Sequence, residues 1–268
     1  MRFTKMEGLG NDYIYLECLE GTPEDLPGLS VRLSDRHFGV GADGIICIKP
    51  GRGGDFSMEM YNADGSRGTM CGNGIRCVGK YVYDKGLTRK TCLTIDTDAG
   101  PRTLELHILD GVVDRVTVNM GLVRVEAPVT LEAAAETFQV VPASAGNPHG
   151  VIFCPDPESV PLERLGPILE RHPALGERRN IEFVSCPNRT RLNVRVWERG
   201  SGVTLACGTG ACAAFTAAWT QNRCDSRAEV SLPGGVLTLE RRGENVFMTG
   251  PARTVFEGDF SQAPKITA

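Results

Sequence analysis

The sequence has 268 residues, of which 41% are hydrophobic and 23% are charged, with a formal net charge of −4. This length accommodates one large domain or two of ordinary size, and the slightly acidic balance gives no electrostatic footprint for nucleic acid or an anionic membrane. No apolar run approaches the length of a membrane span, and the N-terminal residues include no apolar segment typical of a secretory signal. We therefore expect a cytoplasmic protein whose partner is neither nucleic acid nor membrane.

The cysteines are numerous, ten in all, but their density is well below that of a disulfide scaffold. Without a secretory signal, most of them should be reduced thiols. No C-x-x-C pair occurs, and the four histidines are scattered along the chain. These spacings argue against a zinc site, and no metal is expected.

The first half contains a predicted strand, a cysteine turn and a predicted helix, in that order. Residues 55–61 alternate between apolar and polar side chains, which is typical of a half-buried strand. The phrase Cys71-Gly72-Asn73-Gly74 follows, and the apolar residues after it have helical spacing as far as a stop at Lys85-Gly86. Short alternating runs between residues 104 and 118 predict further strands.

The second half repeats this order. Residues 132–136 are expected to form a solvated helical piece or a loop, and residues 191–197 alternate like the earlier strand. The phrase Cys207-Gly208-Thr209-Gly210 then opens a stretch, residues 211–219, that is apolar nearly all round. Such a helix should be buried inside its own half. An alternating run at residues 236–239 predicts one more strand.

The two halves overlay when the chain is shifted by 136 positions. The shift places strand on strand, and it pairs Cys71 with Cys207, Asn11 with Asn147, Asn62 with Glu198, and Gly44 with Asn180. A strand, a cysteine turn and a helix in shared register indicate an internal duplication. We predict an α+β fold of two pseudo-symmetric domains, residues 1–120 and 121–251, each a curved, mainly antiparallel sheet around a central helix.

A cysteine at the start of a helix has help in ionising. The first helical amides have no internal partners, add partial positive charge and can hold a carboxylate. At such a position the pKa of a cysteine can fall below its usual value of about 8.5. Two turns of this kind facing each other would flank one ligand with two thiols. A thiolate could then remove the Cα proton of an amino acid while a thiol returns one to the opposite face.

Seven phrases, in this order along almost the whole chain, carry a specific resemblance. They are Lys5–Asp12, Asp35–Gly44, Asn62–Ser66, Met70–Gly74, Gly146–His149, Glu198–Gly200 and Ala206–Ala213. With them the chain resembles the diaminopimelate epimerase family of cofactor-independent amino-acid racemases and epimerases. The resemblance implies epimerisation of LL- to meso-2,6-diaminopimelate, a step of lysine and peptidoglycan precursor biosynthesis, without PLP or metal.

The same resemblance implies the site. Cys71 and Cys207 would be the acid/base thiols, and His149 and Glu198 would tune their pKa values. The groups that would contact substrate are Asn11, Asn62, Asn147, Asn180, Glu198 and Arg199, with Gly72, Asn73, Gly208 and Thr209 gripping the reacting carboxylate and amine. The resemblance also implies a homodimer and a C-terminal strand, about residues 252–268, that returns to the first domain.

One position departs from the family, and two alternatives stay open. Some members carry glutamine where this chain has Gly44, so the distal end of the substrate would be held by backbone or water there. A racemase of another amino acid, such as histidine, would use the same two thiols. A thiol redox protein would instead cycle a disulfide between Cys71 and Cys207, although the motifs of such proteins are absent.

Overall fold

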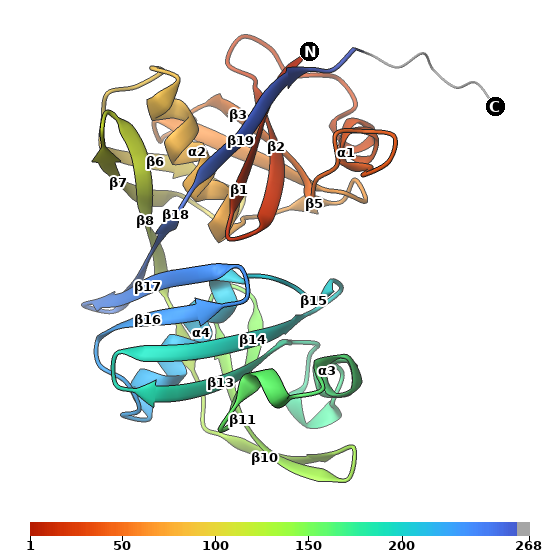
Figure 1. Ribbon diagram of the computed structural model, residues 1–268, viewed down its shortest axis with the longest axis vertical. Coiled ribbons are helices and arrows are strands. Elements are labelled where there is room, and N and C mark those ends of the chain that lie inside the picture. Colours follow the sequence, from red (N-terminus) through yellow and green to blue (C-terminus); the bar gives the residue numbers. More distant parts are fainter. Residues whose placement is uncertain (262–268) are drawn as a thin grey trace, which may run out of the picture. The chain divides into compact units, whose positions relative to one another are not determined.

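The computed structural model describes residues 1–261 of the chain (Figure 1). Contacts divide these residues into two compact units: unit 1 comprises Met1–Asp114 and residues 252–261, and unit 2 comprises Arg115–Pro251. Residues 262–268, the end of the segment expected to return to the first domain, lie outside the described residues.

Unit 1 is a mixed sheet with one helix on each face. Its elements are β1 (Arg2–Gly8), β2 (Asn11–Glu17), α1 (Leu26–Ser34), β3 (Gly44–Pro50), β4 (Phe56–Asn62), β5 (Arg67–Gly68), α2 (Gly72–Asp84), β6 (Cys92–Asp96), β7 (Arg102–Leu109) and β19 (Arg253–Asp259). Strands β19, β1 and β2 are antiparallel neighbours, β2 pairs with β3 in parallel, β3 with β4 antiparallel, β4 with β6 in parallel, and β6 with β7 antiparallel. Helix α2 packs on β1, β2 and β7, and α1 packs on β3 and β4 (Figure 1).

Unit 2 repeats this topology. After β8 (Val112–Leu122), it contains β9 (Arg124–Val125), β10 (Val129–Ala133), β11 (Glu136–Ser144), β12 (Pro148–Phe153), η1 (Pro157–Ser159), α3 (Leu162–Glu170), η2 (Pro173–Leu175), β13 (Asn180–Asn188), β14 (Arg191–Glu198), β15 (Gly202–Val203), α4 (Gly208–Thr220), β16 (Arg227–Leu232), β17 (Gly235–Arg242) and β18 (Asn245–Pro251). Strands β10, β11 and β12 are antiparallel neighbours, β12–β13 and β14–β16 are parallel pairs, and β13–β14 and β16–β17–β18–β8 are antiparallel. The predicted α+β fold with internal pseudo-symmetry is confirmed.

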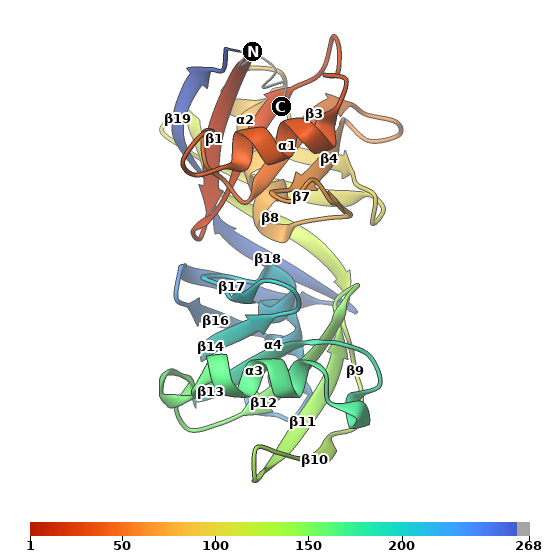
Figure 2. The same ribbon diagram turned by 90° about the vertical axis from the view of Figure 1, so that its right-hand side faces the viewer.

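The helices that follow the cysteines are central in their units. Helix α4 is buried from Gly210 to Ala218, as its all-round apolar sequence predicts. It contacts the strands β11 to β14 and β16 to β18. Figure 2 shows α3 and α4 with the strands of unit 2 between them. The two helices lie on opposite faces of the sheet, because Gly166 of α3 packs on Trp197, whereas Gly210 of α4 packs on Glu182. Helix α2 ends at Asp84, before Gly86 with φ 74°, so the predicted glycine stop is confirmed.

The helical interpretation of residues 132–136 is wrong. These residues form the end of β10, a tight turn and the start of β11. Ala134 and Ala135 occupy the turn with φ values of 51° and 63°. Such turns match the twist of paired strands but favour glycine and asparagine, so two alanines hide the hairpin from sequence inspection.

Among residues 1–261, no helix is long and apolar enough to cross a membrane. The longest, α2 and α4, each have 13 residues, whereas a span needs about 20.

Candidate active site

The first cysteine turn lies at the start of α2, where Cys71 is the N-cap residue. Its backbone is extended, and its Sγ accepts a hydrogen bond from the Gly74 amide at 3.3 Å. The same thiol donates to Oδ1 of Asn11 at 3.2 Å. Gly72 and Asn73 form the first turn of the helix and are buried. Unit 1 therefore brings four of the predicted site residues together around one half-buried thiol.

Asn11 is held in place by a carboxylate. Its Nδ2 donates to Oδ2 of Asp43 at 2.8 Å, which leaves Oδ1 facing Cys71. Arg36 in turn lies 3.0 Å from the other oxygen of Asp43. Burial and the neighbouring Asp12 carboxylate raise the pKa of Asp43. Because an ionised carboxylate only accepts hydrogen bonds, Asp43 orients the amide of Asn11.

Tyr13 and Arg76 also surround Cys71, and the sequence interpretation missed both. Burial, together with the nearby Cys71, raises the pKa of Tyr13 well above its usual value. Arg76 is fully buried in α2, and its Nη1 donates to the carbonyl of Gly72 at 3.1 Å. Burial lowers the pKa of Arg76, but a guanidinium stays protonated in proteins. Cys71 thus has a fixed buried cation on its own helix.

Gly44 and Asn62 face each other at the ends of β3 and β4. Nδ2 of Asn62 donates to Oγ of Ser66 at 3.0 Å. Gly44 has φ 157°, and a Cβ at this position would lie 2.1 Å from the carbonyl oxygen of Tyr61. The backbone conformation here requires glycine, which gives a physical reason for the departure from glutamine.

The second cysteine turn repeats the geometry of the first in a more buried and more acidic setting. Cys207 caps α4, and its Sγ accepts from the Gly210 amide at 3.3 Å and contacts Oγ1 of Thr209 at 3.5 Å. The side chain is only 6% exposed. Burial, followed by the charges of Glu198 and Glu182, raises the pKa of Cys207 well above its usual value. At this cysteine the helix terminus does not produce the lowered pKa that the sequence suggests.

Glu198 lies at the end of β14, beside Cys207. Thr204 donates its hydroxyl hydrogen to Oε1 of Glu198, and the Cys207 thiol is a second hydrogen-bonding partner. Burial raises the pKa of Glu198. Here unit 2 has a carboxylate where unit 1 has the neutral Asn62.

A buried acid–histidine pair completes this side of unit 2. Nδ1 of His149 lies 2.7 Å from Oε1 of Glu182, and both side chains are 0% exposed. Nε2 of His149 lies 3.0 Å from Oδ1 of Asn147. The sequence interpretation found His149 and Asn147 but missed Glu182. The one signal for Glu182 is a carboxylate within an otherwise apolar stretch of strand, Ile181 to Val184.

Asn180 and Arg199 meet through the backbone. Asn180 is the first residue of β13, next to His149 in the neighbouring strand. Its Oδ1 accepts from the amide of Arg199 at 2.8 Å. The guanidinium of Arg199 is exposed and donates to the carbonyl of Arg178 at 3.3 Å. Gly208 and Thr209 form the first turn of α4, so unit 2 brings together all its predicted site residues.

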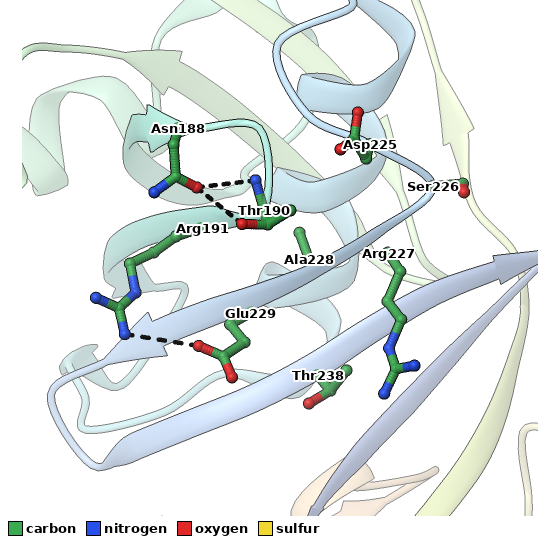
Figure 3. Close-up of a pocket in the computed structure, with 9 residues that line it drawn as sticks. All are labelled: Asn188, Thr190, Arg191, Asp225, Ser226, Arg227, Ala228, Glu229 and Thr238. Carbon is green, nitrogen blue, oxygen red and sulfur yellow. Dashed lines mark hydrogen bonds and ion pairs between the residues drawn. The ribbon is translucent and has the colours of Figure 1, made fainter.

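A separate pocket of about 720 Å³ lies elsewhere on unit 2 (Figure 3). It is lined by residues from the start of β14, from β16 and β17, and from the loop after α4, including the ion pair between Arg191 and Glu229 at 3.6 Å. Arg191 and Glu198 are the two ends of β14, about 23 Å apart at the usual rise of a strand. This pocket contains none of the predicted site residues.

Among residues 1–261, no group of three or more His, Cys, Asp or Glu side chains could hold a metal ion.

The chain is similar to known proteins over nearly its whole length. The sequence model of the family described as diaminopimelate epimerase matches residues 3–126 and 141–255. The diaminopimelate epimerase of Acetivibrio thermocellus is 47% identical over 274 residues, covering 97% of this chain and 98% of that protein. The diaminopimelate epimerase of Methanococcus maripaludis is 45% identical, with coverage of 97% and 99%.

Two solved structures share the fold at low identity. A probable proline racemase from Agrobacterium radiobacter superposes with a TM-score of 0.77 at 14% identity, covering 99% of this chain and 94% of that chain. A phenazine biosynthesis protein of the PhzF family from Bacillus anthracis superposes with a TM-score of 0.74 at 15% identity, covering 96% and 98%. With the family model and the two close relatives spanning nearly its whole length, this chain belongs to the diaminopimelate epimerase family.

Proposed function

We propose that this protein is an isomerase that converts LL-2,6-diaminopimelate to the meso isomer, with Cys71 and Cys207 as its two acid/base groups and with neither PLP nor metal. The observation that carries the proposal is the repeated cap: in each unit a cysteine thiol begins the central helix and accepts from the third amide of that helix. The family of the chain supports the substrate and the reaction class.

In the proposed reaction, one cysteine is a thiolate and the other a thiol. The thiolate removes the Cα proton, and the electron pair of the broken C–H bond delocalises toward the carboxylate. Gly72-Asn73 and Gly208-Thr209 hold this carboxylate and the amine. The helical N-terminal amides favour the carboxylate because it is an anion. The thiol then delivers its proton to the opposite face of Cα. After turnover the two cysteines have exchanged protonation states.

The surrounding groups divide into binding and tuning roles. Asn11, Asn62, Asn147, Asn180 and Arg199 contact the polar ends of the substrate, and any group at Gly44 does so through backbone or water. His149 and Glu198 adjust the protonation of Cys207. Positioned proton transfer contributes about 10²- to 10⁴-fold, and stabilisation of the developing negative charge by oriented dipoles supplies the remainder.

The proposed biological setting follows from the same family. The enzyme works in the cytoplasm as a homodimer, in lysine and peptidoglycan precursor biosynthesis. Its domains, residues 1–120 with the returning C-terminal strand and residues 121–251, close on the substrate to exclude water.

The test is proton NMR of the purified protein in deuterated water with LL-diaminopimelate and a panel of other amino acids. We expect the Cα signal of diaminopimelate to disappear as the meso isomer forms, without added PLP. Cys71→Ser should abolish this exchange, whereas Cys92→Ser, at an exposed cysteine, should not. Full turnover by Cys71→Ser would contradict the mechanism.

The same panel separates the alternatives. Exchange at Cα of histidine or another single-headed amino acid, and none with diaminopimelate, would identify a racemase of different specificity. Peroxide reduction with a cycling Cys71–Cys207 disulfide, without any Cα exchange, would identify a redox protein.

A further inference from the structure

Two register positions differ in chemistry between the units, although the surrounding backbone is the same. The shift of 136 places Tyr13 on His149 and Ile46 on Glu182. Their places against the helices also correspond: a Cβ added to Gly74 of α2 would lie 2.6 Å from Cδ1 of Ile46, and one added to Gly210 of α4 would lie 2.7 Å from Oε1 of Glu182. Unit 2 therefore has a buried carboxylate and imidazole where unit 1 has an apolar side chain and a phenol.

The hydrogen bonds of His149 define a chain of three side chains. Nδ1 contacts Oε1 of Glu182 at 2.7 Å, and Nε2 contacts Oδ1 of Asn147 at 3.0 Å. Both ring nitrogens therefore face oxygen atoms, and an amide oxygen can only accept. A ring that satisfies both contacts carries a proton on each nitrogen, and the buried Glu182 carboxylate is its counter-charge.

We propose that Glu182 is a positioning residue of the epimerase reaction: it holds His149 doubly protonated, so that Nε2–H fixes the side-chain amide of Asn147 with its NH₂ group free for the substrate. This inference rests on the proposed function, in which Asn147 contacts the substrate. An amide that is not fixed can turn by 180° and exchange its donor for an acceptor, which would oppose the same substrate group.

Unit 1 supports this inference, because its matching asparagine, Asn11, is held in the opposite orientation by a direct hydrogen bond to an acidic residue. Asp43 accepts directly from Nδ2 of Asn11 at 2.8 Å, so Oδ1 is the atom left over, and it receives the Cys71 thiol. The paired asparagines therefore present opposite atoms. Asn11 offers an acceptor and Asn147 offers a donor, and an acidic residue determines the orientation in both units.

Three charged side chains interact with His149, namely Glu182, Glu198 and Arg179. Burial raises the pKa of Glu198 in β14, and the interaction with His149 opposes this effect by favouring the ionised carboxylate. Nη1 of Arg179 donates to the backbone carbonyl of His149 at 3.4 Å. Cys207 of α4 lies beside the same two acids.

The variant that tests the proposal is Glu182→Gln, which keeps the size of the side chain and removes its charge. We expect KM to rise about tenfold, the effect of losing one charge-assisted hydrogen bond, with a smaller change in kcat. The matched control is Glu170→Gln, because Glu170 is equally buried in unit 2 and accepts from Trp197 at 2.7 Å. We expect this control to lose stability and to keep KM within about twofold.

A second measurement needs no catalysis, and its first observation is made on the wild-type protein. Proton–nitrogen NMR of the wild-type protein with ¹⁵N-labelled histidine, at neutral pH and without substrate, should show two ring N–H protons on the buried His149. The other three histidines are less buried. Glu182→Gln should remove one of the two protons.

The outcomes separate this inference from the proposed function. A neutral His149 ring in the wild type, or Glu182→Gln with two ring protons or with unchanged KM, would overturn the role of Glu182. Absence of Cα exchange with every amino acid would overturn the proposed function instead, while the NMR spectrum would still decide whether Glu182 holds the ring doubly protonated.

Discussion

The two cysteine turns have the same backbone and different surroundings. Each thiol caps a 13-residue helix and accepts from the third helical amide at 3.3 Å. Around Cys71 the buried charge is the guanidinium of Arg76, whereas around Cys207 it is the pair of acids Glu182 and Glu198. A repeated fold thus supplies two equivalent positions for a proton-transferring group, and a few side chains beneath the helices make those positions chemically different.

The largest expected effect comes from removing either thiol. Cys71→Ser and Cys207→Ser should each lower kcat by at least 10²- to 10⁴-fold, the usual contribution of positioned proton transfer. Rates measured from both the LL and the meso isomer would check this. Retained turnover by one variant would mean that only one turn takes part, which would break the comparison.

Gly74 and Gly210, the third residues of α2 and α4, test how side-chain packing against the two helices differs between the units. Gly74→Ala must displace Cδ1 of Ile46, and Gly210→Ala must displace a carboxylate oxygen of Glu182, from 2.6 and 2.7 Å respectively. We expect each to lower the free energy of unfolding by about 1–3 kcal/mol through overpacking. Urea denaturation would measure this, and only Gly210→Ala should also raise KM, because it pushes against the acid that holds His149. Equal KM increases in both variants would argue that the disturbance is purely steric.

The buried thiol of Cys77 should make the free energy of unfolding depend on high pH through a position that has no cysteine in unit 2. Burial raises the pKa of Cys77 to about 11, and the matching position in unit 2 is Ala213. A raised pKa in the folded state stabilises the protein below the unfolded value, and this stability is lost as the pH rises from about 9 toward 11. The full loss is about 2–3 kcal/mol, from two pKa units. Unfolding by urea at pH 8 and pH 11 should show a smaller pH-dependent loss in Cys77→Ala than in the wild type.

The smallest effect concerns Glu198. After burial, its negative charge is the next cause that raises the pKa of Cys207, so Glu198→Gln should lower that pKa. The thiolate of Cys207 would then form at lower pH. Alkylation by iodoacetamide, followed at Cys207 by mass spectrometry across a pH series, would measure the shift. Cys71 in the same sample is the internal control, and an equal shift there would mean that Glu198 does not act locally.

Much of the fold was predictable because its signals are local and occur twice. Alternation around Phe56 to Met60 recurs around Leu192 to Val196, and each run is followed by Cys-Gly-x-Gly and an apolar helix. The hairpin at Ala134-Ala135 was missed because its positive φ values are carried by residues that rarely adopt them. Tertiary pairing of β10 with β11 determines this turn.

The sequence indicates the residues of the candidate site more fully than their electrostatic surroundings. Cys71, Cys207 and the asparagines lie in motifs that can be recognised in sequence. Glu182 and Arg76 do not, because a charge inside a strand or a helix usually indicates a solvated face. Only the packing reveals that both are buried beneath the helical caps. The raised pKa of Cys207 follows from burial and from the charges of Glu198 and Glu182, which no spacing along the chain could show.

The two units also differ in the order in which their strands are synthesised. All strands of the sheet of unit 2 lie between residues 112 and 251, so this sheet can be completed as soon as that stretch has emerged. Unit 1 needs β19 against β1, with Arg2 opposite Asp259 and the N-terminal amine donating to the carbonyl of Phe260 at 2.9 Å. One edge of its first strand stays unpaired until Arg253–Asp259, the residues of β19, are synthesised. During translation, the half of the protein that is made first is therefore the half that is finished last.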